Sequence, residues 1–259
     1  MLNLGMGKTA MLSRSCAGVV ITLALWSCSS SLVAPPAVRV DGEGRRVLFV
    51  GNSYLYTRNV PGIVQALADS AHGDKLAVAT VAGPDMALVD HWNDGTARNA
   101  IALGGWEWVV LQQGPSSVEV NRDSLRLMTR LFAAEIAKVS ARPALFSAWP
   151  TEQRRQDFDR AIESYTLAAA DVGGLLLPVA AAWVAEWQRD GTAQLYADGL
   201  HPSDAGAYLS GLVVYSRLLG KTPRGLPATL ALHSGSVLTI DPGLAAQLQA
   251  AAAEVTGFP

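Results

Sequence analysis

The feature that most constrains this chain is a regular alternation of short apolar runs with helix-like segments from Arg46 onward. The first run, Val47–Val50, is followed at once by Gly51, a pattern typical of a buried parallel strand. The segment Arg122–Val139 instead carries its apolar residues at helical spacing. The predicted strands are Val47–Val50, Leu76–Val81, Trp108–Leu111, Pro143–Ala148 and Leu175–Leu177, and the predicted helices are Val60–Ala71, Ala97–Leu103, Arg122–Val139, Phe158–Asp171, Val179–Gln188, Ser203–Leu219 and Leu244–Val255.

Strands that alternate with helices predict an α/β fold, in which a parallel sheet carries helices on both faces and the crossovers are right-handed. No internal repeat or second linker interrupts the pattern, so residues 46–259 are predicted to form one domain. Its C-terminal helix, Leu244–Val255, is expected to pack on the sheet. Ligands of such folds bind at the carboxyl ends of the strands. The residues that follow each strand are therefore the candidates for chemistry.

The composition excludes several classes of protein. Of the 259 residues, 50% are hydrophobic and 16% are charged, so the chain can bury a core and is not a disordered protein. Its formal net charge of -2 offers no basic face, so we expect no nucleic-acid partner. Both cysteines, Cys16 and Cys28, precede the domain, which excludes a disulfide framework, a cysteine metal site and a cysteine nucleophile within it.

The N-terminal segment has the layout of an export signal. Lys8 and Arg14 precede the uncharged stretch Ala17–Trp26, as in a secretory signal peptide. The following run Leu25–Cys28 resembles a bacterial lipobox, although Trp26 is bulkier than the usual residue. We predict a signal peptide at 1–27, a lipidated Cys28, a flexible tether over 28–45, and a lipid anchor in the membrane of the cell envelope. The alternatives are plain secretion or an uncleaved anchor.

A serine follows the first predicted strand, in the run Gly51-Asn52-Ser53. A serine on a tight turn between a strand and a helix can present its Oγ at the top of a sheet. The N-terminus of the helix then offers N–H groups to a developing oxyanion. The alternative is an ordinary turn in which the serine caps a helix.

An aspartate and a histidine share one loop later in the chain, in the run Asp198-Gly199-Leu200-His201. A carboxylate three residues before a histidine can accept the Nδ1 proton and leave Nε2 free as a base. The alternative is helix capping, with Ser203 or Asp204 as the N-cap and His201 exposed.

Taken together, these two blocks resemble the SGNH/GDSL hydrolase family over residues 46–225. The block His201-Pro-Ser-Asp-Ala-Gly-Ala-Tyr208 is the most specific, and Gly-Asn-Ser stands where the family usually has Gly-Asp-Ser. The resemblance implies a flavodoxin-like three-layer α/β/α sandwich with a five-stranded parallel sheet. It also implies that Ser53 is the nucleophile, His201 the general base and Asp198 the orienting carboxylate.

The resemblance further implies an oxyanion hole, which departs from the family's pattern here. The expected donors are the N–H of Ser53, the N–H of a glycine in the second block and a side-chain amide in the third. Gly83 is the natural glycine, but Pro84 follows it and has no N–H, so Asp85 is the alternative. The third block has Gln112 and Gln113 in place of asparagine. Neighbouring residues of a strand face opposite ways, and we favour Gln113 as the donor.

Four further residues are predicted to line the substrate pocket: Tyr54, Asp85, His91 and Trp149. His91 follows the second strand, and its alternative role is that of a hydrogen-bonded partner of a loop. Trp149 follows the fourth strand and could stack on a sugar, and its alternative role is core packing. No metal site and no organic cofactor is predicted.

The predicted function is that of a serine esterase or deacetylase of the cell envelope. We expect it to hydrolyse small acyl esters, with O-acetylated carbohydrate as the preferred substrate class. One alternative is an acyltransferase that uses the same three residues. A second is a catalytically inactive carbohydrate-binding protein on this fold. The sequence leaves the oligomeric state open.

Overall fold

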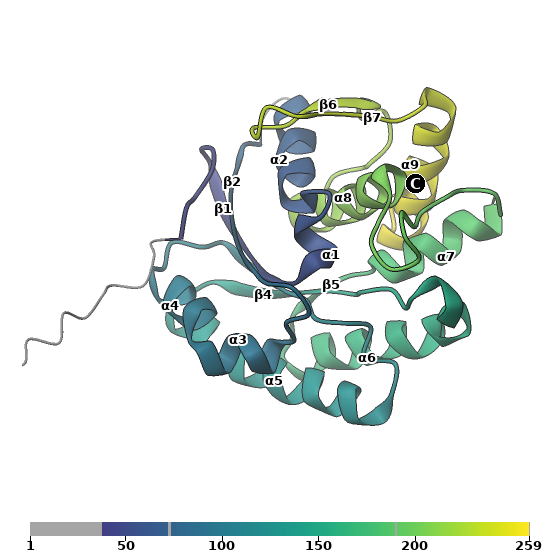
Figure 1. Cartoon of the computed structure of the whole chain (residues 1–259). Coiled ribbons are helices and arrows are strands. Elements are labelled where there is room, and N and C mark those ends of the chain that lie inside the picture. The colour runs from purple at the N-terminus through teal and green to yellow at the C-terminus, as the bar shows by residue number, and fades with distance from the viewer. Residues whose placement is uncertain (1–37, 72–73, 190, 259) are drawn as a thin grey trace, which may run out of the picture. The chain divides into compact units, whose positions relative to one another are not determined.

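The computed structural model describes residues 38–71, 74–189 and 191–258, and these form the α/β fold that the sequence predicts (Figure 1). Five parallel strands make one sheet in the order β2-β1-β3-β4-β5. This is the flavodoxin-like order, and its topological switch point lies between β1 and β3. The strands are β1 (Arg45–Gly51), β2 (Leu76–Ala82), β3 (Trp108–Leu111), β4 (Arg142–Phe146) and β5 (Leu175–Leu177).

Helices cover both faces of the sheet, which confirms the three-layer α/β/α sandwich. One layer holds α2 (Val60–Ser70), α7 (Val179–Arg189), α8 (Asp204–Leu219) and α9 (Pro242–Thr256). The other holds α3 (Leu88–Asp94), α4 (Thr96–Ala102), α5 (Glu119–Lys138) and α6 (Phe158–Asp171). α9 packs against α7 and α8 rather than on the sheet, because those two helices already occupy the face that it was expected to cover.

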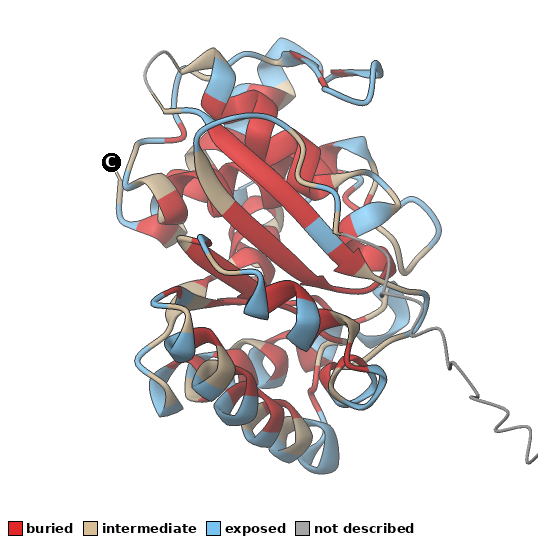
Figure 2. Cartoon of the chain, turned by 90° about the vertical axis from the view of Figure 1, so that its left-hand side faces the viewer, coloured by how far each residue is buried: buried red, intermediate tan, exposed pale blue. Residues whose placement is uncertain are grey.

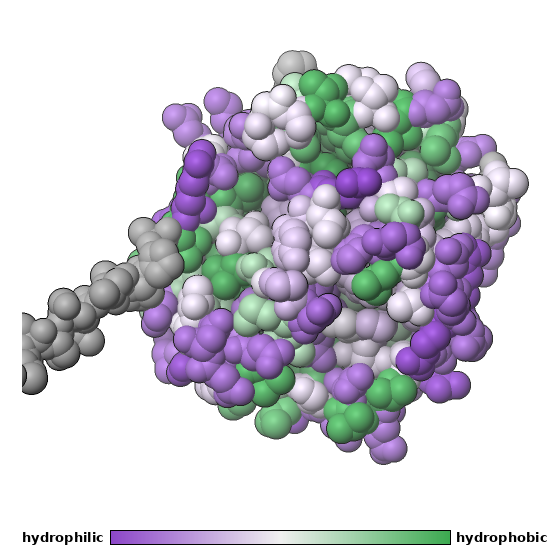
Figure 3. All heavy atoms as spheres, in the orientation of Figure 1, coloured by the Kyte–Doolittle hydropathy of each residue, from purple (hydrophilic) through white to green (hydrophobic). Residues whose placement is uncertain are grey.

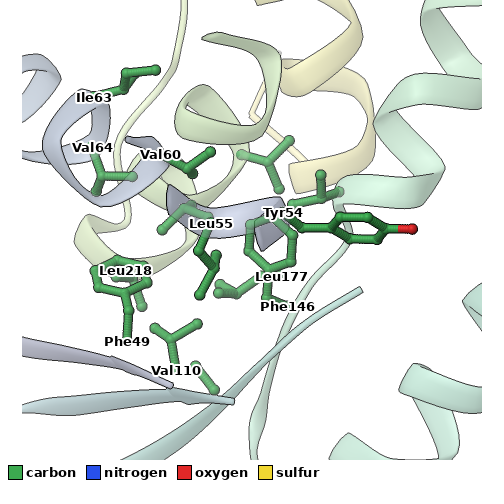
Figure 4. Packing of buried hydrophobic residues seen from close by; sticks show 14 of the residues in the cluster. Phe49, Tyr54, Leu55, Val60, Ile63, Val64, Val110, Phe146, Leu177 and Leu218 are labelled. Atoms are coloured by element: carbon green, nitrogen blue, oxygen red, sulfur yellow. The ribbon is translucent and has the colours of Figure 1, made fainter. Parts of the chain in front are cut away.

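Apolar burial accounts for the central strands. Val47–Val50 of β1 are completely buried, because β2 and β3 flank the strand and helices cover both of its faces. Figure 2 shows the sheet buried between helices whose outer sides are exposed. Above β1, Leu55, Val60 and Ile63 belong to the same buried cluster as Phe49 (Figure 4). This packing fixes the end of β1 and the short segment that follows it.

The structure also holds elements that the periodicity did not reveal. These are the one-turn helix α1 (Ser53–Tyr56), helix α3, a 3-10 segment (Glu152–Asp157) and an antiparallel pair, β6 (Thr229–Ala231) and β7 (Val237–Thr239). The chain also joins the fold earlier than the predicted tether allows, since Asp41 pairs with Val78 through two backbone hydrogen bonds of 2.8 and 2.9 Å.

The predicted signal peptide and the lipidation site at Cys28 lie outside the described residues. None of the helices within the described ranges is long and apolar enough to cross a membrane.

Candidate active site

The first component of the site is the turn at the carboxyl end of β1. Asn52 caps α1, and its Oδ1 accepts the Tyr54 N–H at 3.2 Å. Ser53 is therefore the first residue of that helix, at the sheet edge where ligands bind in this fold. The Ser53 N–H has no hydrogen-bond partner among the described residues, so it can serve an external acceptor.

The second component is the loop before α8, which brings a histidine to this serine. His201 Nε2 lies 3.0 Å from Ser53 Oγ, and His201 Nδ1 lies 2.7 Å from Asp198 Oδ2. The other carboxylate oxygen, Oδ1, accepts the backbone N–H groups of His201 at 2.7 Å and of Leu200 at 3.0 Å. The hydrogen bond from the His201 ring and these N–H groups lower the pKa of Asp198 to about 2. The loop therefore holds an ionised carboxylate against the histidine.

The capping interpretation of this loop holds for Ser203 but not for an exposed His201, which is half-buried. Ser203 is the N-cap of α8, and its Oγ accepts the Gly206 N–H at 3.1 Å. The cap fixes the start of the helix, while His201, two residues earlier, turns to Ser53. A capping signal in the sequence therefore did not argue against a catalytic histidine.

A column of stacked aromatic rings supports the histidine loop from below. The Tyr54 ring stacks on Trp149 with centroids 4.8 Å apart, and Trp149 stacks on Trp183 at 4.0 Å. Trp149 Nε1 donates to the Leu200 carbonyl at 2.9 Å. Trp149 is completely buried, so the prediction that it walls the pocket is wrong. Its ring lies beneath the cleft and holds the loop that carries His201.

Gln112 joins the end of β3 to the serine turn. Its Oε1 accepts the Asn52 N–H at 2.9 Å, and its Nε2 donates to Asn52 Oδ1 at 3.0 Å and to the Gln113 carbonyl at 2.6 Å. The side chain is completely buried. A Cβ at Gly51 would come within 2.2 Å of Gln112 Oε1, so the glycine of Gly-Asn-Ser leaves room for this amide. The geometry makes Gln112 a support of the turn.

Gln113, the next residue along the chain, lines the cleft. Its Nε2 donates to Ser116 Oγ at 2.8 Å, and its Oε1 accepts the Leu88 N–H at 3.2 Å. Its backbone is fixed by the buried Tyr165 hydroxyl, which accepts the Gln113 N–H at 3.0 Å and donates to the Gln113 carbonyl at 2.8 Å. Of the two glutamines, Gln113 is therefore the one that a bound substrate can reach.

The second block offers one open backbone donor. The Gly83 N–H donates to the Gly51 carbonyl at 3.3 Å, which continues the pairing of β1 with β2. The Asp85 N–H has no partner in the described part of the chain, and Asp85 lines the cleft in a left-handed conformation with a φ of 55°. The geometry therefore favours Asp85 over Gly83 as the second-block donor.

His91 supports the sheet edge from inside. It is 1% exposed, it does not line the cleft, and its Nε2 lies 2.7 Å from the Gly51 carbonyl. Burial lowers the pKa of His91, so the ring is neutral and Nε2–H donates to that carbonyl. The expectation that His91 lines the pocket is wrong, and its alternative role as a hydrogen-bonded partner is the one observed.

The cleft itself has a volume of about 350 Å³ and opens beside Ser53. Most of the surface at the centre of the face around α1 is polar (Figure 3). Tyr54 and Asp85 line the cleft as predicted, and so does Ser116, which belongs to the third block of the resemblance. Asn121 and Ser124 are lining residues that sequence reasoning missed. Both lie near the start of α5, the helix that follows β3. Ligands of this fold bind beyond the carboxyl ends of the strands, so their place in the chain could have indicated them. Within the described ranges, no group of three or more His, Cys, Asp or Glu side chains is placed to hold a metal.

Sequence comparison gives no relative, since no family model and no curated protein matches the chain. Among solved structures, the chain is similar to a protein from Slackia heliotrinireducens that is assigned to the SGNH hydrolases. The two share 27% identity, and the match has a TM-score of 0.58 and covers 68% of this chain and 100% of that chain.

Two more distant matches show the same fold. A DUF4886 family protein from Bacteroides uniformis matches with a TM-score of 0.69 at 16% identity, over 84% of this chain and 97% of that one. An acetylxylan esterase from Geobacillus stearothermophilus matches with a TM-score of 0.51 at 17% identity, over 72% of this chain and 96% of that one. The fold implied by the sequence resemblance is thereby confirmed.

Proposed function

We propose that this chain, an SGNH/GDSL-like ester hydrolase, removes small acyl groups, and O-acetyl groups in particular, from carbohydrate by a Ser-His-Asp mechanism. One observation carries the proposal: hydrogen-bonded contacts of 3.0 and 2.7 Å run without a break from Ser53 Oγ through His201 to Asp198. A serine in this arrangement can lose its proton to the histidine as it attacks a carbonyl carbon.

The proposed reaction has two halves. Ser53 Oγ attacks the ester carbonyl while His201 Nε2 takes the hydroxyl proton, and Asp198 stabilises the imidazolium that forms. The histidine then gives this proton to the leaving alcohol, and an acyl-serine remains. A water, deprotonated by the same Nε2, attacks the acyl-serine, releases the carboxylic acid and restores the serine hydroxyl.

The oxyanion of each tetrahedral intermediate needs hydrogen-bond donors that are free in the resting protein or can leave their resting partners. The unpartnered N–H groups of Ser53 and Asp85 supply two in this proposal. Gln113 Nε2 supplies the third when it turns toward the developing charge from its two resting partners, Ser116 Oγ at 2.8 Å and the Asn121 carbonyl at 3.4 Å. Gln112 is fully engaged with the serine turn and takes no direct part.

The cleft supports a small acyl group on a hydroxyl-rich alcohol. Its volume of about 350 Å³ is modest, and it is lined by the hydrogen-bonding side chains of Asn52, Gln113, Ser116, Asn121 and Ser124. The similarity in fold to an acetylxylan esterase is consistent with an acetylated glycan as substrate.

For the location of the protein, we propose export and lipid anchoring at Cys28 in the cell envelope, which rests on the sequence of the N-terminal segment.

The test is acetate release from p-nitrophenyl acetate and from acetylated xylo-oligosaccharides by the full-length protein. Ser53→Ala should lower turnover at least ~10³-fold while the protein stays folded. Ser234→Ala is the matched control, since Ser234 is an exposed serine in the turn between β6 and β7, and it should keep full turnover. A fluorophosphonate should label the wild type and not Ser53→Ala. Equal turnover of Ser53→Ala and wild type would contradict the mechanism, and glycan binding without acetate release would support the inactive alternative.

A further inference from the structure

We infer that Asp85 makes the cleft selective for esters of uncharged, hydroxyl-rich alcohols and rejects esters that carry a carboxylate near the scissile bond. This inference rests on the proposed esterase function. Asp85 is exposed, and it is the one side chain with a formal charge among the described residues that line the cleft. Its carboxylate has no hydrogen bond or ion pair within the described part of the chain, so it is available to a ligand.

The backbone that carries this carboxylate is constrained. Asp85 follows Pro84 and has a φ of 55°, a left-handed conformation that aspartate and asparagine tolerate better than most residues. The next turn is fixed by α3, where Asp90 Oδ2 accepts the Ala87 N–H at 2.8 Å. Asp85 therefore stands on a short, constrained connection and lines the same cleft as Ser53.

Two arginines on the described segments that flank the cleft already face carboxylates. Arg58, which follows α1, pairs with Asp204 at 2.9 Å. Arg122, at the start of α5, lies within 4 Å of the carboxylates of both Glu119 and Asp123. The ionised Asp198, whose Oδ2 lies 2.7 Å from His201 Nδ1, adds a second negative charge near the reacting groups. A substrate carboxylate in this cleft would therefore be repelled by both aspartates and lose its water without gaining a salt bridge.

An uncharged sugar meets the same groups favourably. Its hydroxyls can donate to the Asp85 carboxylate and can accept from or donate to Asn121 and Ser124, which line the cleft with it. The cleft therefore suits neutral acetylated glycans and disfavours acetylated uronates. The discrimination is electrostatic, so it should weaken as ionic strength rises.

The experiment compares two esters that differ only at C6, which is an uncharged hydroxymethyl group in one and a carboxylate in the other: a methyl glucoside and a methyl glucuronoside, each acetylated at the same hydroxyl. The wild type should prefer the neutral ester in kcat/KM on the order of 10-fold, as expected for two like charges ~7 Å apart at an effective dielectric constant of ~40. Asp85→Asn should bring this ratio close to one at low salt. Asparagine also tolerates the left-handed backbone, so the variant removes the charge and keeps the conformation.

Glu163→Gln is the control, because it removes a charge of the same sign from an exposed site on α6 that does not line the cleft, and it should leave the ratio as in the wild type. A wild type that cleaves both esters equally well would overturn the inference and leave the esterase function intact. An Asp85→Asn variant that slows both esters by the same factor would also overturn it. If the wild type cleaves neither of these two esters nor p-nitrophenyl acetate, the proposed function itself is overturned.

Discussion

Replacing Gln112 by methionine tests whether the serine turn is positioned by the amide beneath it. Methionine has nearly the volume of glutamine, so the change removes hydrogen bonds without opening a large cavity. Three contacts are lost: the Asn52 N–H to Oε1, and Nε2 to Asn52 Oδ1 and to the Gln113 carbonyl. After the change, Asn52 Oδ1 still accepts from Tyr54, and the Gln113 carbonyl still accepts from Tyr165. The Asn52 N–H is left buried without a partner.

These losses set the expected magnitude. The orphaned Asn52 N–H costs about 1–3 kcal/mol, and each of the other two lost hydrogen bonds costs about 0.5–1.5 kcal/mol. Part of this is offset by burial of the methionine side chain, so the free energy of unfolding should fall by about 2–4 kcal/mol. Because Ser53 follows Asn52 directly, a turn that shifts by ~1 Å should also lower kcat by up to ~10²-fold, with a small change in KM.

The assay combines urea unfolding, followed by tryptophan fluorescence, with the kinetics of p-nitrophenyl acetate hydrolysis. Gln65→Met is the matched control. Gln65 is also a buried glutamine, and its Nε2 donates to the carbonyls of Asp41 at 2.8 Å and Leu76 at 2.9 Å, in contacts that do not involve the serine turn. It should lose stability and keep its kcat. If Gln112→Met and Gln65→Met have the same kcat at a similar loss of stability, Gln112 does not position the nucleophile and the reasoning is refuted.

Other predictions concern single groups. Gln113→Ala should lower kcat by ~10²–10³-fold with little change in KM, measured on the same ester, because it removes a donor that acts in the transition state. Asp198→Asn should lower kcat by roughly 10⁴-fold. The pKa of Asp198 is depressed from 3.8 to about 2, so the ionised carboxylate stabilises the fold above pH 4, and this contribution is lost as the pH falls toward 2. Acid unfolding should show this loss of stability in the wild type and not in Asp198→Asn. Burial lowers the pKa of His91 below its ordinary value of 6.5, so the unfolded chain binds the proton more readily than the folded one. The free energy of unfolding should therefore fall as the pH drops below 6.5, and His91→Gln should weaken this dependence of stability on pH. Cys28→Ser should move the protein from the membrane fraction to the soluble fraction, and a free N-terminus beyond Cys28, found by mass spectrometry, would contradict lipidation.

The sequence by itself predicts the sheet and most of its helices, because these elements follow from local patterns. A buried parallel strand must be apolar on both faces, so the apolar run Val47–Val50 predicts a strand. The spacing of apolar residues in α5 alone indicates which side of that helix is buried. The elements that were missed are short. Helix α1 and the pair β6–β7 have three or four residues per element, too few to establish a period.

The three residues proposed to react could also be identified from the sequence, because each sits in a local signal at the end of a strand or the start of a helix. Asp198 and His201 share a loop, and their hydrogen bond at 2.7 Å spans three residues. That His201 reaches Ser53, 148 positions away in the chain, needed the topology that puts both loops at the same sheet edge.

Only the tertiary structure decides the roles of the residues around them. Gln112 and Gln113 are adjacent and chemically identical, yet one is buried against Asn52, 60 positions away, and the other faces the cleft. Trp149 and His91 have types that suit a pocket, but packing from distant segments places both beneath it. The physical reason is that burial and hydrogen-bond partners are set by residues far apart in the chain. Local periodicity can place a residue on an element, whereas packing decides what its side chain touches.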